Sequence, residues 1–391
     1  MSLKYCIKTF GCAQNVADSE RISAFYESRG YEETKLDEEA DIIVINTCVI
    51  RGRAEEKVYG LIRNLEPLRE KKPELSFVIT GCLIGAATRE PSGKMMKALR
   101  KRVPHAQFLP LDEVGFEYAP KRTSGKKANV PISNGCNNYC TYCIVPFSRG
   151  KEWSRPFEDI LSEVEDCVAH GFDEIVLLGQ NVNSYGADFL QKTLRENSEK
   201  DGEHKQSPYT LPNGEKVTPV MVKHLNRHRI PTIFPQLLEA VASVSGVNKV
   251  SFLSSNPWDF SDELIAVMAK HANIDRLLHL PIQSGSDTVL KNMNRWYTRA
   301  EYMDLVKRIR KAIPEIEITT DIIVGFPGET EEHFQETMDL ARQVKFKGAY
   351  IAWYSPRPGT AAATKMSDDI TFSEKKRRFK LIDDLVFRRS K

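Results

Sequence analysis

The chain carries three cysteines within eight residues in the stretch Cys136-Asn-Asn-Tyr-Cys140-Thr-Tyr-Cys143. A four-iron cluster takes one ligand per iron, and thiolates are its usual ligands. The spacing C-x3-C-x2-C supplies three ligands and leaves one iron open to an exogenous molecule. A structural zinc site is the alternative, but it needs a fourth Cys or His close by. The nearest one downstream is Cys167, which falls inside a predicted helix.

On the carboxyl side of this stretch, β-branched runs alternate with amphipathic helical segments. Strands are expected at residues 130–133, 174–178, 249–253, 277–282, 317–324 and 349–354, and helices at 157–170, 235–244, 262–271, 299–312 and 329–344. Six strands alternating with helices predict a partial (β/α)6 barrel of the TIM type, with active-site groups on the loops after the strands. Residues 187–232 are polar, contain four prolines and show no clear period, which predicts an insertion in a barrel loop.

On the amino-terminal side, a second alternation predicts an open parallel α/β sheet with helices on its faces. Its strands are expected at residues 5–9, 41–45 and 76–80, and its helices at 18–29, 54–68 and 94–101. The chain is therefore of the α/β class. We divide it into an N-terminal domain (1–118), a polar, turn-rich linker (119–129), a barrel core (130–372) and a basic C-terminal helix (373–391).

Three further cysteines follow the strands of the N-terminal sheet. Cys12, Cys48 and Cys82 each come two or three residues after a predicted strand. Ligands of parallel sheets collect outside the carboxyl ends of the strands, so these thiols are expected on one rim. Gly11 and Gly81 precede two of them and would let the backbone approach a bulky ligand. We interpret the three as a metal site; the alternative is three buried thiols that act as small hydrophobic side chains.

Composition indicates a globular protein. The 391 residues are 41% hydrophobic, and 56 Lys and Arg nearly balance 53 Asp and Glu, for a net charge of +3. This balance excludes a histone-like binding protein. No apolar run approaches the ~18 residues of a membrane span and no export signal is visible, which predicts a soluble, cytoplasmic protein. The remaining cysteines, Cys6 and Cys167, are expected to be structural.

The small net charge hides two basic regions. Residues 89–127 contain ten basic and four acidic side chains, and residues 373–391 contain eight and three. Such regions can neutralise phosphates of a nucleic acid. The alternative is that both are solvated faces.

The cysteine spacing resembles the signature of the radical S-adenosylmethionine (SAM) enzymes. The resemblance implies that Cys136, Cys140 and Cys143 ligate a [4Fe-4S] cluster whose open iron binds SAM, and that one-electron reduction then releases a 5′-deoxyadenosyl radical. It also implies that Tyr142 packs near the adenine. Further SAM contacts are implied for residues in the loops after the strands, with ordinary turn chemistry as the alternative: Gly179, Gln180, Asn181, Ser254, Gln283, Ser284 and Asp321.

The motifs Thr9-Phe-Gly-Cys-Ala-Gln-Asn15, Ile45-Asn-Thr-Cys48 and Thr80-Gly-Cys82 are similar to those of the methylthiotransferase family within that superfamily. The resemblance implies that these three cysteines bind an auxiliary [4Fe-4S] cluster, whose open iron holds the sulfur that is methylated and transferred. Two clusters make chemical sense, because one generates a radical and the other offers sulfur to the resulting carbon radical. Nothing in the sequence indicates catalytic residues beyond the cluster ligands.

Within the family, three segments are most similar to enzymes that convert C2–H of N6-isopentenyladenosine beside the tRNA anticodon into a methylthio group. They are Val49-Ile-Arg-Gly-Arg-Ala-Glu-Glu-Lys-Val58, Cys140-Thr-Tyr-Cys-Ile-Val-Pro-Phe-Ser-Arg-Gly150 and Tyr354-Ser-Pro-Arg-Pro-Gly-Thr360. The alternatives are threonylcarbamoyladenosine in tRNA and an aspartate of a ribosomal protein. A two-cluster iron–sulfur carrier is the non-enzymatic alternative, although carriers usually have four cysteines per cluster.

The implied partners are a tRNA substrate, an electron donor such as a flavodoxin-type reductant, and a sulfur donor that the sequence does not identify. We expect a monomer with no membrane association. The family usually carries a small C-terminal RNA-binding β-barrel, and none is expected within these 391 residues.

Overall fold

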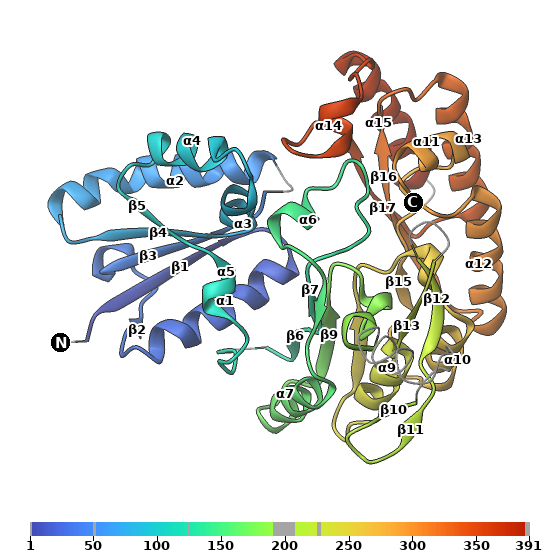
Figure 1. Cartoon of the computed structure of the whole chain (residues 1–391), viewed down its shortest axis with the longest axis horizontal. Coiled ribbons are helices and arrows are strands. Elements are labelled where there is room, and N and C mark those ends of the chain that lie inside the picture. The colour runs from blue at the N-terminus through green and yellow to red at the C-terminus, as the bar shows by residue number, and fades with distance from the viewer. Residues whose placement is uncertain (1, 50–51, 123–124, 191–207, 225–227, 388–391) are drawn as a thin grey trace, which may run out of the picture. The chain divides into compact units, whose positions relative to one another are not determined.

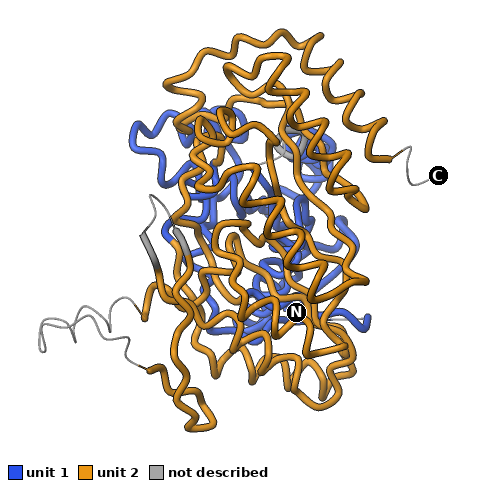
Figure 2. The backbone as a smooth tube through the Cα atoms, turned by 90° about the vertical axis from the view of Figure 1, so that its right-hand side faces the viewer, with its two compact units in different colours: residues 1–131, 144–151 blue, residues 132–143, 152–391 orange. Residues whose placement is uncertain are grey.

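The computed structural model describes residues 2–49, 52–122, 125–190, 208–224 and 228–387, which divide into two compact units. Unit 1 comprises residues 1–131 and 144–151, and unit 2 comprises residues 132–143 and 152–391 (Figure 2). The chain therefore passes between the units three times. The stretch with three cysteines belongs to unit 2, whereas the eight residues that follow it return to unit 1.

Unit 1 is built on a five-stranded, all-parallel sheet with the strand order β2-β1-β3-β4-β5. The strands are β1 (Lys4–Phe10), β2 (Glu32–Glu33), β3 (Ile42–Thr47), β4 (Ser76–Gly81) and β5 (Ala106–Leu109). The helices are α1 (Ala13–Glu27), α2 (Gly52–Lys71), α3 (Cys82–Arg89), α4 (Lys94–Arg102), α5 (Leu111–Val114) and α6 (Val145–Ser148), and β6 (Lys127–Pro131) ends the first segment. The order 2-1-3-4-5 is that of flavodoxin-type doubly wound folds.

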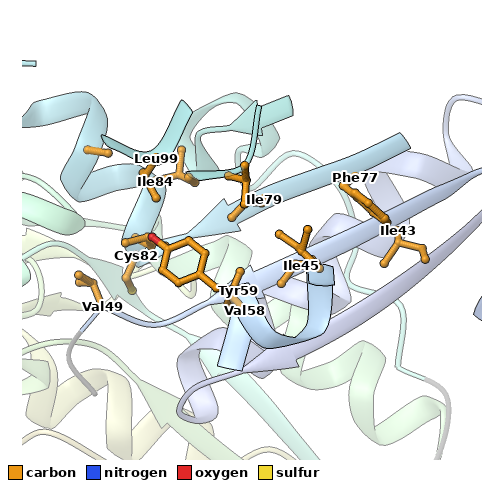
Figure 3. Close-up of a cluster of buried hydrophobic side chains, with 14 of the residues drawn as sticks. Ile43, Ile45, Val49, Val58, Tyr59, Phe77, Ile79, Cys82, Ile84 and Leu99 are labelled. Carbon is orange, nitrogen blue, oxygen red and sulfur yellow. The ribbon is translucent and has the colours of Figure 1, made fainter. Parts of the chain in front are cut away.

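Both faces of this sheet are apolar because its strands alternate between two cores. Ile43 and Ile45 of β3 pack on the side of α2 and α4, together with Phe77 of β4 (Figure 3). Val44 points the opposite way, into a second cluster with Ile22 of α1. Helices therefore cover both faces, with α2 and α4 on one and α1 on the other (Figure 1).

The predicted strands of unit 1 occur as β1, β3 and β4, each a residue or so longer or shifted. The sequence did not reveal β5, whose four residues, Ala-Gln-Phe-Leu, include no β-branched side chain. It also placed the first helix too late. That helix begins at Ala13, where Asn15 bends back and its Oδ1 accepts a hydrogen bond from the backbone N of Cys12 at 3.2 Å.

Unit 2 is a mixed α/β unit with parallel sheets. Strands β9 (Glu174–Leu178) and β14 (Lys249–Phe252) pair in parallel, as do β15 (Leu277–His279), β16 (Glu317–Val324) and β17 (Gly348–Trp353). The principal helices are α7 (Phe157–Ala169), α9 (Phe234–Ala242), α10 (Asp262–Lys270), α11 (Asp287–Asn292), α12 (Arg299–Ala312), α13 (Glu331–Val344), α14 (Ala361–Lys365) and α15 (Phe372–Phe387). Helices and parallel strands alternate along the chain, as the sequence predicted.

The segment predicted as an insertion contains regular structure that the sequence did not reveal. Two antiparallel hairpins form, from β10 (Tyr209–Thr210) with β11 (Lys216–Val217) and from β12 (Val220–His224) with β13 (His228–Thr232). Strands β10 and β11 have two residues each, which is too short to show alternation. Residues 191–207 and 225–227 of this segment, and residues 388–391 of the predicted C-terminal helix, lie outside the described residues.

None of the helices in the described part of the chain is both long enough and apolar enough to cross a membrane.

Candidate functional site

The cysteines of unit 1 lie at the carboxyl ends of three neighbouring strands. Phe10, Thr47 and Gly81 end β1, β3 and β4, and they are register partners across the sheet. Cys48 and Cys82 follow Thr47 and Gly81 directly, and Cys12 follows Phe10 by two residues. The structure therefore brings these thiols to one rim of one sheet, as the strand pattern predicted.

Two of these thiols are in direct contact. The side chains of Cys48 and Cys82 share a hydrogen bond, and both are buried, whereas Cys12 is exposed. The hydrogen bond to Cys48, followed by burial, raises the pKa of Cys82 well above its usual value. Thiols bind metal as thiolates, so metal binding at this site must release the proton of Cys82.

Gly81 is required at the end of β4. Its φ of +91° lies in the region that side chains disfavour, and a Cβ atom would overlap the carbonyl oxygen of Thr47. Only glycine lets the chain turn here so that α3 begins at Cys82.

An asparagine pair fixes the loop that carries Cys12. Asn15 Nδ2 donates to Asn46 Oδ1 at 3.2 Å, and Asn46 Nδ2 donates to the Asn15 carbonyl at 2.8 Å. Both residues are fully buried. Because Asn46 lies in β3, next to the strand end, these bonds hold the Cys12 loop against the same rim as Cys48.

A buried ion pair that the sequence did not predict lies beside this rim. Arg149 Nη2 is 2.6 Å from Asp18 Oδ2, and Arg149 interacts electrostatically with Cys82 and Cys12. Burial alone would lower the pKa of Arg149, but Asp18 and Cys82 outweigh burial and raise it. Arg149 is therefore a permanent cation at the thiols. No spacing signal links it to them, because it lies 67 residues beyond Cys82.

The cysteine loop of unit 2 is held from one neighbouring segment. The backbone N of Thr141 donates to the Met293 carbonyl at 3.0 Å, and Thr141 Oγ1 donates to the Asn292 carbonyl at 2.8 Å. Asn294 Nδ2 donates to the carbonyl of Tyr139 at 3.0 Å. These bonds maintain a strained backbone, since Tyr139 has a φ of +46°.

Arg295 brings a buried guanidinium to this loop. Its Nη1 lies 3.7 Å from Cys140 Sγ and 3.1 Å from Asn256 Oδ1, and its Nη2 lies 3.0 Å from the Pro281 carbonyl. Its Cζ is 4.6 Å from the ring centroid of Trp258. The role of Arg295 could not be predicted from the sequence, because nothing in a single sequence distinguishes it from a surface arginine.

Buried oxygen atoms without hydrogen-bond partners gather in the loops of unit 2. Among the described residues they include Ser133 Oγ, Asn138 Oδ1, Asn181 Oδ1, Asn183 Oδ1, Ser255 Oγ, Asp259 Oδ1 and Ser286 Oγ. Leaving such atoms unpaired costs about 1–3 kcal/mol each, so their concentration in the cysteine loop and the loops after the strands suits a polar ligand. The amino, carboxylate and ribose groups of SAM are of this kind.

Backbone strain marks the same loops. Four of the five described non-glycine residues with positive φ lie in the cysteine loop or in loops that follow strands or precede α12: Tyr139, Ser254, Gln283 and Asn294. Strain of this kind persists where surrounding structure enforces it, and it clusters at functional sites. Ser254 and Gln283 were both predicted as SAM-contacting residues.

The other predicted SAM residues have varied surroundings. A Cβ atom at Gly179 would lie 2.6 Å from Ser133 Oγ, so a side chain there would collide with this hydroxyl. Gln180 Oε1 accepts a hydrogen bond from the backbone N of Gly135. Asn181 Nδ2 donates to Asp259 Oδ2 at 2.7 Å, which leaves its own oxygen unpaired. Their role in binding SAM stays a prediction.

Three predicted residues already have protein partners. Tyr142 packs edge-on against Phe326, with 6.5 Å between the ring centroids. Ser284 Oγ is 3.3 Å from Thr337 Oγ1, and Asp321 Oδ2, in the middle of β16, is 3.3 Å from His279 Nε2. The roles of these three residues in binding SAM stay predictions.

Two buried acidic residues that were not predicted from the sequence also lie in the loops of unit 2. Burial raises the pKa of Glu152 to about 7, against the opposing hydrogen bond from Ser184. Burial also raises the pKa of Asp259 well above its usual value. Neither lies in a motif, and only the fold brings them together with Asn181.

Within the described residues, no three His, Cys, Asp or Glu side chains converge on a single metal ion. A four-iron cluster does not require such convergence, because each thiolate binds a different iron. The donors fit two clusters because each group consists of cysteines, the usual ligands of a four-iron cluster, and members of each group interact with one another. Cys143 and Cys140 interact electrostatically with Cys136, and Cys48 is hydrogen-bonded to Cys82.

Comparison with known proteins gives the class. Residues 130–341 match the model of the Radical SAM superfamily, and residues 4–100 match the model described as Uncharacterized protein family UPF0004. Among solved structures, the radical S-adenosylmethionine methyltransferase TsrM from Kitasatospora setae superposes with a TM-score of 0.54 at 14% identity, covering 93% of this chain and 75% of that one. At this identity the likeness shows the fold alone. The chain is thus a radical SAM enzyme.

Curated relatives narrow the class to a family. A protein of Caldicellulosiruptor saccharolyticus named tRNA-2-methylthio-N(6)-dimethylallyladenosine synthase is 38% identical over 411 residues, covering 99% of this chain and 79% of the relative. A protein of the same name from Geobacillus kaustophilus is 39% identical over 409 residues, covering 98% and 69%. The chain belongs to the radical SAM methylthiotransferase family, whose members use SAM and two [4Fe-4S] clusters.

Proposed function

We propose that this enzyme converts C2–H of N6-isopentenyladenosine, next to the tRNA anticodon, into a C2-methylthio group. Cys136, Cys140 and Cys143 would hold the cluster that binds SAM, and the thiols on the rim of unit 1 would hold the auxiliary cluster. The observation that carries the proposal is the placement of Cys12, Cys48 and Cys82 just after three register-matched strand ends. The substrate is that of the curated relatives, as their names state it.

The two clusters, when bound, supply a 5′-deoxyadenosyl radical at one site and sulfur at the other. The residues of unit 2 would orient SAM. The unpaired oxygens of Asn181 and Ser255 would accept its polar hydrogens, while Tyr142 would pack beside the adenine. Arg295 would balance the negative charge of the thiolates through Cys140. In unit 1, Gly81 and the asparagine pair would keep the thiols on their rim.

We further propose that unit 2 is a partial (β/α)6 barrel. Support comes from the parallel pairing of β9 with β14 and of β15, β16 and β17, and from the helices that follow these strands. In this arrangement the cysteine loop and the loops after the strands lie together at the carboxyl end of the barrel. The domains would be those of the sequence analysis, with residues 1–118 carrying the auxiliary cluster and 130–372 the SAM site.

For tRNA we propose the exposed face of α4. Lys94, Lys97, Arg100 and Lys101 are all exposed there, and none of these four forms an ion pair with another described residue. Uncommitted cations of this kind can bind phosphates.

The described part of the other basic region, α15, is less suitable for RNA because protein contacts occupy three of its five cations. Lys375 and Arg378 are buried in ion pairs with Asp368 and Glu329, and Arg377 pairs with Glu374. Only Lys376 and Lys380 of the described basic residues in α15 are exposed without such a pair.

Remaining partners follow from the proposed chemistry. We propose a monomer that works in the cytoplasm, where its tRNA substrate is found, and that takes electrons from a flavodoxin-type reductant. The sulfur donor would recharge the auxiliary cluster after each transfer.

Iron counting after anaerobic reconstitution tests the two sites. About eight irons per chain are expected, and replacing Cys12, Cys48 and Cys82 with Ala should leave about four. An unchanged count would remove the auxiliary cluster from this rim.

Mass spectrometry of tRNA tests the substrate. Cells that lack the protein should lose methylthio-isopentenyladenosine and regain it on complementation. If methylthio-threonylcarbamoyladenosine or a modified ribosomal-protein aspartate is lost instead, the proposed substrate is wrong.

A further inference from the structure

A buried cation, Arg149, lies beside the auxiliary cysteines. It belongs to the segment that directly follows Cys136, Cys140 and Cys143 in the sequence. Arg149 lies six residues after Cys143, in the segment 144–151 of unit 1. Its side chain is 4% exposed, and its guanidinium contacts both carboxylate oxygens of Asp18, at 2.6 and 3.4 Å. The same cation interacts with Cys82 and Cys12.

The position of Arg149 is fixed by backbone contact with the helix that Cys82 begins. Gly85 of α3 lies directly against Ser148 of α6, and a Cβ atom at residue 85 would overlap the Ser148 carbonyl oxygen. Arg89, one turn along α3, donates from Nη1 to the same carbonyl at 2.9 Å. Because Ser148 immediately precedes Arg149, these contacts hold the guanidinium at a set distance from the start of α3.

A buried cation affects the two redox states of an iron–sulfur cluster unequally. Reduction adds one negative charge to a cluster that thiolates already make anionic, so a nearby cation stabilises the reduced state more than the oxidised one. Such interactions are strong where water is excluded. Asp18 acts in the opposite direction, because its carboxylate offsets part of the arginine's charge.

The SAM-binding site of unit 2 shows the contrasting case. Arg295 is also buried and lies 3.7 Å from Cys140 Sγ, but its hydrogen-bond partners are the neutral groups of Asn256, Pro281 and Tyr297. No carboxylate of the described chain lies within ion-pair distance of it. Asp259 interacts with Arg295 electrostatically from beyond ion-pair distance, so the two sites differ in whether a carboxylate pairs directly with the cation.

We propose that Arg149 and Asp18 are positioning residues that together set the reduction potential of the auxiliary cluster, which Arg149 raises and Asp18 lowers. This inference rests on the proposed function, in which Cys12, Cys48 and Cys82 hold that cluster. Because Asp18 offsets part of the charge of Arg149, the auxiliary cluster has a lower reduction potential than it would have with Arg149 and no carboxylate. A one-electron donor therefore reduces the auxiliary cluster less readily, which favours delivery of electrons to the SAM-binding cluster.

The test is a redox titration of the full chain with dithionite, monitored by electron paramagnetic resonance. The background carries Ala at Cys136, Cys140 and Cys143, so that only the auxiliary cluster is loaded, and its iron content is measured first. Arg149→Met should reduce the equilibrium constant for reduction about tenfold, which is ~59 mV for a one-electron couple. Asp18→Asn should shift the potential by a similar amount in the opposite direction.

Two further variants separate charge from structure. Arg149→Lys keeps the cation and should retain most of the parent potential. Arg155→Met removes a matched buried pair, because Arg155 Nη1 lies 2.6 Å from Glu163 Oε2 and both side chains are under a tenth exposed. It should leave the potential unchanged.

The outcomes are distinct. Opposite shifts for Arg149→Met and Asp18→Asn support the inference, whereas unchanged potentials or shifts of the same sign overturn it. If Arg149→Met fails to load iron, Asp18→Asn alone decides: a higher potential supports the inference and an unchanged one overturns it. A parent background that holds no iron would instead show that the proposed auxiliary site is wrong.

Discussion

The carbonyl oxygen of Thr47 occupies the space that a side chain at Gly81 would need. The two residues are register partners that end β3 and β4, and each is followed directly by a cysteine. Close approach of the two strand ends therefore brings Cys48 and Cys82 within hydrogen-bonding distance, and the absence of one side chain makes the thiol pair possible.

Gly81→Ala should consequently disrupt the auxiliary site more than it disrupts the fold. The backbone conformation of Gly81, with φ +91° and ψ −162°, costs a non-glycine residue roughly 1–3 kcal/mol, and the overlap with Thr47 adds to this. We expect loss of about four irons, counted after reconstitution, with the SAM-binding cluster retained. Gly30→Ala is the matched control, because Gly30 has a φ of +81° but nothing within 4 Å of the added atom. It should cost stability and keep all the iron.

Charge reversal on α4 should weaken tRNA binding. Lys97→Glu with Lys101→Glu removes two exposed cations from that helix, and the slope of log affinity against log salt should fall by about one for each lost phosphate contact. Lys376→Glu with Lys380→Glu makes the same change of charge on α15. Filter binding at several salt concentrations compares the two. Equal losses of affinity would show that net charge, and not the α4 face, governs binding.

Arg378 and Glu329 form a buried pair at 2.8 Å, with side-chain exposures of 5% and 1%. Arg378→Met should destabilise unit 2 by about 3–5 kcal/mol, because it leaves a buried carboxylate without its partner. Thermal unfolding of the cluster-free chain, followed by circular dichroism, measures the loss. The double variant with Glu329→Gln should recover part of it, and no recovery would contradict the pairing.

The C-terminal helix should lose part of its stability in acid, because Glu374 pairs with Arg377 and Arg378 of the same helix. Hydrogen bonds from Arg377 and, less strongly, Arg378 lower the pKa of Glu374 to about 2, against an opposing effect of burial. A lowered carboxyl pKa stabilises the fold above the unfolded value of about 4.5, and this stabilisation disappears as the pH falls toward 2. Urea unfolding should show wild type more stable than Glu374→Gln at pH 7, with the difference shrinking between pH 4.5 and 2. A constant difference would refute the ionic contribution.

The sequence predicted the features that depend on the hydrophobic pattern of a single strand or helix. Alternating β-branched runs predicted β1, β3 and β4, and their ends predicted that Cys12, Cys48 and Cys82 share a rim. Both predictions use local pattern and the rule that parallel strands present their carboxyl ends on one edge. The family followed from the same motifs, and the comparisons confirm it.

Residues that act through long-range contact could not be predicted in this way. Arg149 reaches Asp18 across 131 positions, and Arg295 reaches Cys140 across 155. Arginine is common, and its burial is visible only once the chain has folded. The buried acids Glu152 and Asp259 were missed for the same reason, since desolvation by the surrounding loops sets their protonation.

The return of residues 144–151 to unit 1 has a consequence for biosynthesis. Domains usually fold in turn as they emerge from the ribosome. Here the nascent N-terminal unit lacks α6 until residue 151 has been translated. Until then, the surface of α3 around Gly85, which contacts Ser148 of α6, is exposed to solvent. A chain released at the linker would present that unfinished face. Recombination between relatives could therefore exchange the N-terminal unit only together with the first eight residues after Cys143.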